Sequence, residues 1–197
     1  MVRWEPGARY RLGAAALELF AERGFEQTTV TEIAVRAGVT ERTFYRHFGD
    51  KRGVLFGGGD DLLDYLTKAV SERAAAGDLP LSAVATAFEL ASRDVFADRL
   101  EFARTRAAVI AAHPELSERE LWKMAKIVLA LADSLQVAGV DQNRARLAAE
   151  SGTAAFRLAF ARWVAAGNAR SLADLVEETF GDLRTIVAET ARDLSTS

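Results

Sequence analysis

The sequence predicts an all-α protein. Apolar residues recur every three or four positions along most of the 197 residues, which is the period of amphipathic helices. Most glycines and prolines fall between these periodic segments, where helices begin or end. Half of the residues are apolar, so the chain can form one or two helical domains with a substantial core. We therefore expect about nine helices in all, in a domain of residues 1–52 and a larger domain of residues 53–197.

The first helix is predicted over residues 8–23. Its apolar face consists of Leu12, Ala16, Leu19 and Phe20. Gly24 should end it, and a glycine-terminated helix often brings the next apolar residue back onto its last turn. We therefore expect Phe25 to contact Phe20.

Two short helices with a tight turn are predicted between residues 29 and 48. Thr29 and Glu32 have the spacing of a capping box, in which each side chain accepts a hydrogen bond from the other residue's backbone amide. Gly38 suits the turn, because glycine adopts a positive φ without a steric penalty. Thr40 should cap the second helix, with Val39 packing against Phe44 across the turn.

The second short helix has one apolar side and one polar side. Phe44 and Phe48 lie four residues apart and should point inward. Arginine can form paired hydrogen bonds with guanine in the major groove, and hydroxyl and ammonium groups suit phosphate, so the pattern predicts a helix-turn-helix that binds DNA. Asp50 should cap a third helix and place Lys51 near the DNA backbone. The predicted DNA-binding residues are Thr29, Thr40, Arg42, Thr43, Tyr45, Arg46, His47 and Lys51.

The stretch ALELFAERGFEQTTVTEIAVRAGVTERTFYRHFGDKRGVL, from Ala16 to Leu55, resembles the N-terminal pattern of the tetracycline-repressor (TetR) family of bacterial transcriptional regulators. Beyond about Leu66 only the helical layout and the length are similar. The resemblance implies a homodimer that binds a palindromic operator in double-stranded DNA and is released by a small molecule. It identifies neither the operator nor the ligand.

The net charge by itself does not indicate DNA binding. The chain has 25 basic and 28 acidic side chains. Residues 1–52 hold 9 basic and 7 acidic side chains, whereas residues 53–197 hold 16 and 21. Attraction to phosphate must therefore depend on where the cations lie rather than on bulk charge.

Three consecutive glycines, Gly57 to Gly59, interrupt the helix that is predicted to open at Asp50. Each costs about 1 kcal/mol relative to alanine inside a helix, so the helix should kink, loosen or break there. This departs from the family, whose fourth helix normally runs through. Either a functional hinge between ligand site and DNA or a local irregularity accounts for the glycines equally well.

The predicted C-terminal domain contains the ligand site. Helices are expected over about 80–91, 97–112 and 114–137. They should enclose a cavity for a small apolar effector, although each aromatic residue on them also suits an ordinary core. The predicted lining residues are Phe88, Phe102, Trp122 and Met124. His113 precedes a proline, and the interpretation as a helix-end residue bonded to a carbonyl is favoured over a ligand contact.

The last two helices, expected over about 141–166 and 171–194, are predicted to form the dimer surface. Each has more apolar surface than one internal contact needs, so a four-helix interface across a two-fold axis would bury it. Burial within one subunit is the alternative. The predicted interface residues are Phe156, Phe160, Trp163, Phe180, Leu183 and Val187.

Several classes of protein find no support in the sequence. The chain has no cysteine and only two histidines, and it lacks the motifs of a hydrolase, a zinc protease or a nucleotide site. We expect no catalytic residue, no metal and no cofactor. The N-terminus has no apolar signal segment and no apolar run reaches membrane length, so we expect a cytoplasmic protein without a membrane partner. The alternative function is a helical adaptor that binds proteins without ligand control.

Overall fold

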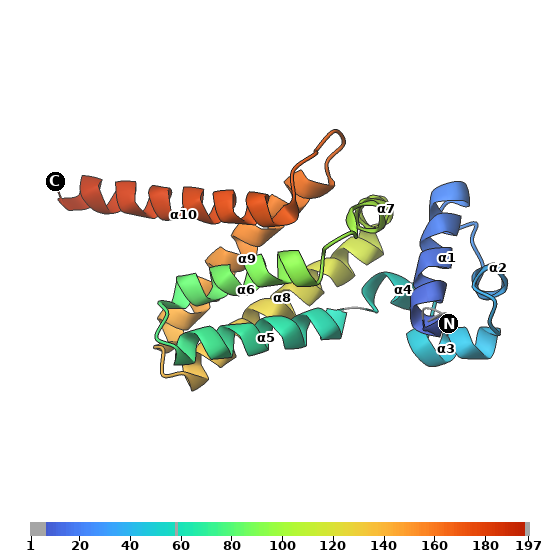
Figure 1. Ribbon diagram of the computed structural model, residues 1–197, viewed down its shortest axis with the longest axis horizontal. Helices are drawn as coiled ribbons and strands as arrows, with labels where there is room; N and C mark the ends of the chain where they lie inside the picture. The colour runs from blue at the N-terminus through green and yellow to red at the C-terminus, as the bar shows by residue number, and fades with distance from the viewer. Residues whose placement is uncertain (1–6, 58, 196–197) are drawn as a thin grey trace, which may run out of the picture. The chain divides into compact units, whose positions relative to one another are not determined.

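The computed structural model describes residues 7–57 and 59–195. Ten helices account for most of this part of the chain (Figure 1). They are α1 (Ala8–Arg23), α2 (Val30–Arg36), α3 (Glu41–Phe48), α4 (Gly53–Phe56), α5 (Gly59–Ala75), α6 (Pro80–Asp94), α7 (Leu100–Ala111), α8 (Pro114–Val137), α9 (Gln142–Val164) and α10 (Leu172–Ser195). The predicted all-α class is confirmed.

One helix is divided as expected, and another begins later than expected. The helix predicted to open at Asp50 is divided into α4 and α5, so the expected break at the glycines is confirmed; Gly58 itself lies outside the described residues. The helix expected from residue 97 begins at Leu100. Asp98 has φ of 55°, a conformation that cannot lie inside a right-handed helix.

The chain forms two compact units. The N-terminal unit comprises residues up to Asp60 and the segment Glu101–Glu120, and the second unit comprises Asp61–Leu100 and Leu121–Ser197. This division differs from the predicted boundary at residue 52. Val54 and Leu55 on α4 are buried in the core of the N-terminal unit, as are three apolar residues of the 101–120 segment, namely Val109, Ile110 and Leu116.

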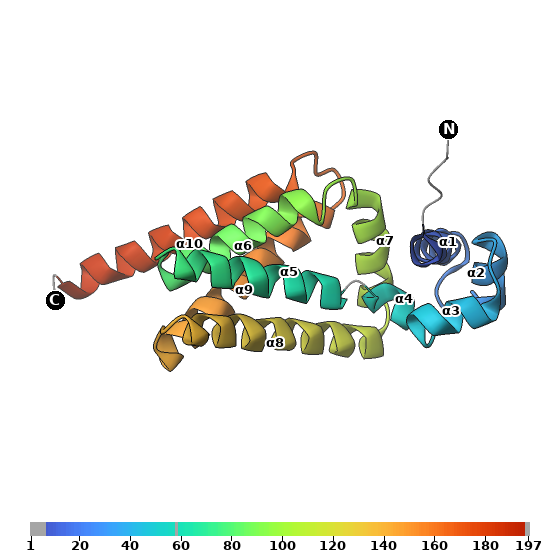
Figure 2. The same ribbon diagram turned by 60° about the horizontal axis from the view of Figure 1, so that its bottom comes forward.

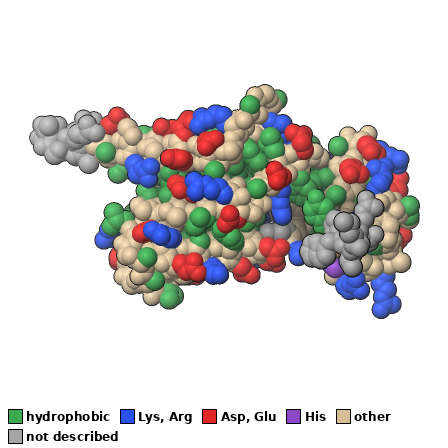
Figure 3. Space-filling view, in the orientation of Figure 1, with side chains coloured by type: hydrophobic (Ala, Val, Ile, Leu, Met, Phe, Trp, Pro, Cys, Tyr) green, Lys and Arg blue, Asp and Glu red, His purple; other side chains and the backbone are tan. Residues whose placement is uncertain are grey.

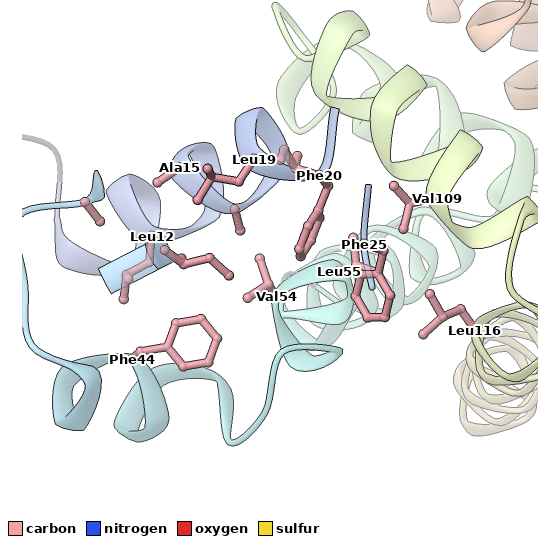
Figure 4. Packing of buried hydrophobic residues seen from close by; sticks show 14 of the residues in the cluster. Leu12, Ala15, Leu19, Phe20, Phe25, Phe44, Val54, Leu55, Val109 and Leu116 are labelled. Carbon is pink, nitrogen blue, oxygen red and sulfur yellow. The ribbon is translucent and has the colours of Figure 1, made fainter. Parts of the chain in front are cut away.

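The core of the N-terminal unit is formed by α1, α3, α4 and the α7–α8 junction (Figure 4). Leu12 and Phe44 are fully buried, and Phe44 points toward Leu12 and Val54. Phe25 contacts Phe20 edge-on with ring centroids 5.0 Å apart, which confirms the predicted contact after the first helix. This core fixes one side of α3, so its opposite side faces outward.

The second unit is built on α6, α9 and α10, which pack against one another (Figures 1 and 2). Gly152 on α9 lets α6 approach closely, since a Cβ there would lie only 2.4 Å from Val84 Cγ1. In both views the C-terminal part of α10 extends past the other helices of this unit. Among the described residues, no helix combines the length and the apolar character that crossing a membrane requires.

Candidate nucleic-acid interface

The turn between α2 and α3 has the geometry that the sequence predicts. Gly38 has φ of 67°, and its amide donates to the carbonyl of Val35 over 3.1 Å. The Val39 amide donates to the carbonyl of Ala34 over 3.0 Å. These two bonds form a Schellman motif, which ends α2 and sets the direction in which the chain enters α3.

A complete capping box begins α2. Thr29 Oγ1 accepts a hydrogen bond from the Glu32 amide, and Glu32 Oε2 accepts one from the Thr29 amide over 2.9 Å. The bonds from Thr29, backbone first, together with the nearby Arg23, hold the pKa of Glu32 below its usual value. Thr29 was predicted to bind DNA, and here its hydroxyl is occupied in starting the helix.

Thr40 caps the N-terminus of α3, and its hydroxyl accepts a hydrogen bond from the Thr43 amide. The two threonine hydroxyls lie 3.1 Å apart. Glu41, at the first position of the helix, accepts a hydrogen bond from Thr31 Oγ1 over 2.6 Å. The N-terminus of α3 is therefore fixed both to its own first turn and to α2.

The outward side of α3 exposes three of the predicted DNA-binding side chains. Arg42 and Arg46 are exposed, and Tyr45 is 50% exposed with its ring edge-on to Phe44. Figure 3 shows Lys and Arg side chains projecting from the edge of the N-terminal unit at which α3 lies. Within the described residues neither guanidinium has an ion pair or a hydrogen bond, so both are available to a ligand.

The arginines next to this surface are engaged. Arg36 on α2 forms a bidentate pair with Glu22 over 3.1 Å, and this hydrogen bonding lowers the pKa of Glu22. Arg23 pairs with Glu32 over 2.7 Å. The contrast matters because guanidiniums on α1 and α2 hold those helices together, whereas those on α3 contribute no comparable internal contact.

Lys51 is placed differently from the prediction. Its ammonium donates to the backbone carbonyls of Phe25, Glu26 and Thr28 over 2.6, 3.4 and 3.1 Å. It also lies 4.3 Å from the centroid of the Phe25 ring. Lys51 thus closes the loop between α1 and α2, and a contact with phosphate would have to replace these bonds.

Comparison with known proteins agrees with this geometry. Residues 12–56 match the family model described as bacterial regulatory proteins, tetR family. The N-terminal unit therefore carries a tetR-family sequence. The matched residues include all of α2, the turn and α3.

One curated relative that the chain matches is the HTH-type transcriptional regulator TcmR of Streptomyces glaucescens. The two are 41% identical over 80 residues, which is 41% of this chain and 35% of the relative. The match thus spans about a third of the relative's length.

Two solved structures match the chain over most of its length. The crystal structure of Thermus thermophilus FadR, a TetR-family transcriptional repressor in complex with lauroyl-CoA, is 25% identical, with a TM-score of 0.53 and coverage of 91% of this chain and 93% of that one. A transcriptional regulator from Aquifex aeolicus is 17% identical, with a TM-score of 0.58 and coverage of 91% and 99%. The second likeness concerns the fold alone.

The residues predicted to line a ligand cavity are divided between the two units and differ in burial. Phe88 is buried and stacked on Phe156, with ring centroids 4.4 Å apart. Phe102, which belongs to the N-terminal unit, is 40% exposed. Trp122 is 62% exposed, with the Lys126 ammonium 4.0 Å from its ring centroid. Phe88 is therefore a core residue, and Trp122 lies on the surface of the second unit.

Met124, the fourth predicted lining residue, is half-buried. An apolar hollow in the second unit lies elsewhere. Its lining consists of Leu79, Leu81, Ser82, Ala85, Phe180 and Arg184. None of the four predicted residues is part of it, because the hollow is formed between α6 and α10 rather than beside α8.

Three residues predicted to form the dimer surface are instead buried in the second unit. Phe156, Trp163 and Phe180 are 4%, 4% and 1% exposed in the single subunit. Their rings belong to one aromatic cluster, whose contacting members are Phe88, Phe96, Phe156, Phe160, Trp163 and Phe180. The core of the second unit thus contains three of the six residues that were predicted to form the dimer surface. Phe160 and Leu183 are half-buried, and Val187 is 58% exposed.

Sequence reasoning missed the contacts that hold α4. Arg106 on α7 donates to the Leu55 carbonyl and pairs with Glu120 over 2.6 Å. These residues are up to 65 positions apart, so no local pattern signals them. His113 was interpreted correctly as a helix-end residue, since its Nδ1 lies 2.8 Å from the Val109 carbonyl oxygen.

Proposed function

We propose that this protein is a DNA-binding transcriptional regulator of the tetR family, most simply a repressor, which binds a palindromic operator as a homodimer and is released by a small apolar molecule. The observation that carries the proposal is the outward side of α3, where Arg42, Tyr45 and Arg46 stand exposed on a helix whose opposite side is anchored by Phe44. A helix of this kind fits the major groove of B-DNA.

The remaining predicted contacts belong to the edges of this surface. Thr43 and His47 are half-buried on one flank of α3, where hydroxyl and imidazole groups suit the phosphates beside the groove. Thr29 and Thr40 stand at the N-termini of α2 and α3, and helix N-termini favour anions. We propose that these four residues contact the DNA phosphates and position the protein, and that the arginines of α3 contact the bases.

Dimerisation is part of the proposal because one α3 occupies only one half-site. Two copies would reach successive major grooves roughly 34–36 Å apart. The C-terminal part of α10, which extends past its unit, supports a contact with a second copy. There Leu183 is half-buried and Ile186 and Val187 are 60% and 58% exposed, at spacings that put them on one side of the helix.

We propose that the effector binds in the second unit. Thermus thermophilus FadR, with the same fold, was crystallised with lauroyl-CoA, a molecule with a long apolar chain. The second unit here is rich in aromatic side chains, and apolar and aromatic side chains line most ligand pockets. A ligand that prefers one conformation of the dimer by a few kcal/mol is sufficient to release DNA. A regulator of this kind would act in the cytoplasm, where it meets the chromosome.

The competing function is a helical adaptor for protein partners. It accounts for the exposed part of α10 but gives no role to the exposed cations of α3. We favour a regulator over both an adaptor and an enzyme because the curated relatives matched by the N-terminal unit carry the names of transcriptional regulators.

A mobility-shift assay with the full-length protein and the DNA upstream of its own gene tests the proposal. Tyr45→Ala and Arg46→Ala should each weaken binding, and binding should fall steeply with salt. Both side chains are exposed, so the melting temperature should stay within about 2–4 °C of the parent value. Arg93→Ala, on α6 in the second unit, is the matched control. Undiminished binding by both α3 variants would contradict the assignment.

Effector release is tested separately with lauroyl-CoA as the probe. The protein is bound to its DNA, the probe is titrated, and the bound fraction is followed by fluorescence anisotropy. Release at micromolar probe supports an apolar effector. If neither lauroyl-CoA nor a panel of shorter and longer acyl-CoA esters releases the DNA, an acyl effector is excluded.

A further inference from the structure

We infer that each operator half-site contains two guanines about two base steps apart, one recognised by Arg42 and the other by Arg46. The inference rests on the proposed function and specifies the chemistry that α3 recognises. It depends on three observations: the place of these side chains on the helix, their lack of internal partners, and the absence of a neutralising carboxylate beside them.

The first observation is the position of the two arginines around α3. Phe44 is fully buried, and Phe48 packs against the same core. With 3.6 residues per turn, Arg42 and Arg46 lie nearly opposite these two rings, four residues apart on one ridge. When the outer ridge of α3 faces the floor of the groove, these two side chains are the ones that meet base edges.

The second observation is that both guanidiniums are uncommitted. Arg36, one helix away, forms two hydrogen bonds with Glu22. By contrast, neither Arg42 nor Arg46 has an ion pair or hydrogen bond in the part of the chain that the structure describes. No internal bond has to be broken before either of them binds a base.

The third observation concerns Glu41, the acidic residue that adjoins Arg42 in sequence. Its carboxylate accepts a hydrogen bond from Thr31 on α2 over 2.6 Å. That bond directs the carboxylate toward α2. In the described part of the chain Glu41 forms no ion pair with Arg42, and the Glu41–Thr31 bond holds the first turn of α3 in place.

The chemistry then selects the base. A guanidinium presents two parallel N–H donors, and among the four bases guanine alone offers two acceptors, O6 and N7, on its major-groove edge. Four residues of α-helix rise about 6 Å, against about 3.4 Å for one base step. Arginines at this spacing therefore reach guanines about two steps apart, on one strand or on opposite strands.

The test starts with selection of bound sequences from a random duplex library by the full-length protein. Each selected guanine is then replaced by 7-deazaguanine, which loses the N7 acceptor but keeps normal base pairing. We expect two positions per half-site at which this change weakens binding about fivefold to more than a hundredfold. They should lie about two steps apart.

Three variants assign the positions. Arg42→Lys and Arg46→Lys keep the positive charge but lose the paired donors. In each variant, replacement by 7-deazaguanine should no longer weaken binding at one of the two guanines, while it still does so at the other. Arg36→Lys, whose parent side chain is committed to Glu22, should leave both penalties unchanged. A consensus without guanine in the half-site, or lysine variants that keep both penalties, would overturn the inference while leaving DNA binding intact. Failure to select any DNA would overturn the proposed function as well.

Discussion

The Nε of Arg106 on α7 donates a hydrogen bond to the backbone carbonyl of Leu55 on α4 over 2.6 Å. The same guanidinium pairs with Glu120 over 2.6 Å and lies 5.3 Å from the ring centroid of Phe56. α4 is a helix of only four residues, and its last carbonyls have no helical partner. A residue far away in sequence thus completes the end of the helix that follows the DNA-binding motif.

The first prediction is that Arg106→Met destabilises the protein by roughly 2–3 kcal/mol. The Arg106 side chain is only 13% exposed, so its loss leaves the Leu55 carbonyl and the Glu120 carboxylate without this donor in a partly buried place. Urea unfolding of both proteins measures the difference. Arg119→Met is the control, because the exposed Arg119 guanidinium lies over the face of the Phe56 ring. Such an exposed cation–π contact contributes about 0.5–1 kcal/mol. Equal losses in the two variants would contradict the role of the Leu55 bond.

The second prediction concerns the capping box of α2 and its response to pH. Thr29→Ala should lower stability by about 1 kcal/mol at neutral pH. The Thr29 hydrogen bonds hold the pKa of Glu32 below its ordinary value of 4.5. A carboxyl group whose pKa is lowered in the folded protein stabilises the fold at pH values above its ordinary pKa. This contribution is lost as the pH falls through the lowered pKa.

The measurement is the unfolding midpoint of the parent and of Thr29→Ala from pH 7 down to pH 3. The two curves should approach each other below about pH 4.5, because protonated Glu32 no longer completes the box. Other carboxyl groups with a lowered pKa, such as Glu22, are present in both proteins, so their effects cancel in the difference between the two midpoints. A difference that stays constant over the whole range would argue against the coupling.

The helix-turn-helix was predictable because its signals are local. The capping box of Thr29, the left-handed Gly38 and the Thr40 cap each involve residues within five positions of one another. Short-range hydrogen bonds depend on spacing, and spacing can be read from sequence. The same reason explains why the boundaries of most helices were predicted within a few residues.

The allocation of apolar surface could not be predicted in the same way. Periodicity shows that Phe156, Trp163 and Phe180 lie on apolar sides of helices, but it does not show whether the partner is the same subunit or another. The structure uses all three in the second unit's own core. Likewise, nothing in the local pattern of Val109 assigns it to the core of the N-terminal unit.

Lys51 illustrates a further limit. A lysine beside a helix start in a basic motif predicts a phosphate contact, yet its ammonium reaches carbonyls of Phe25 and Thr28, 23 or more positions earlier in the chain. Lysine has a long flexible stem and three donors, so sequence position fixes its target poorly.

The third prediction is that Gly53→Ala destabilises the N-terminal unit by about 3 kcal/mol. A Cβ on Gly53 would lie 1.9 Å from the carbonyl oxygen of Phe48, and this oxygen is backbone that cannot rotate away. Relief would displace the end of α3, so DNA binding should weaken as well. Gly13→Ala on α1 is the control: its Cβ meets nothing within 4 Å, and the helix should gain up to about 1 kcal/mol. Parental stability of Gly53→Ala, measured by urea unfolding, would refute the close approach.

The fourth prediction tests the close approach of α9 to α6. Gly152→Ala would put a methyl group 2.4 Å from Val84 Cγ1 and 3.5 Å from Phe180 Cε1. Overpacking typically costs about 1–3 kcal/mol, which exceeds the gain of up to about 1 kcal/mol from replacing glycine in a helix. Thermal unfolding should therefore show a net loss. Gly181→Ala on α10, where a Cβ meets nothing within 4 Å, should instead stabilise the protein.

A double variant decides whether the clash with Val84 is the cause. Val84→Ala alone should destabilise, because Val84 is fully buried and its methyl groups leave a cavity. In the double variant the methyl group introduced by Gly152→Ala fills part of that cavity, so the combined loss should be smaller than the sum of the single losses by about 1 kcal/mol or more. Additive losses would mean that Gly152 is required for another reason, such as a contact with a second subunit.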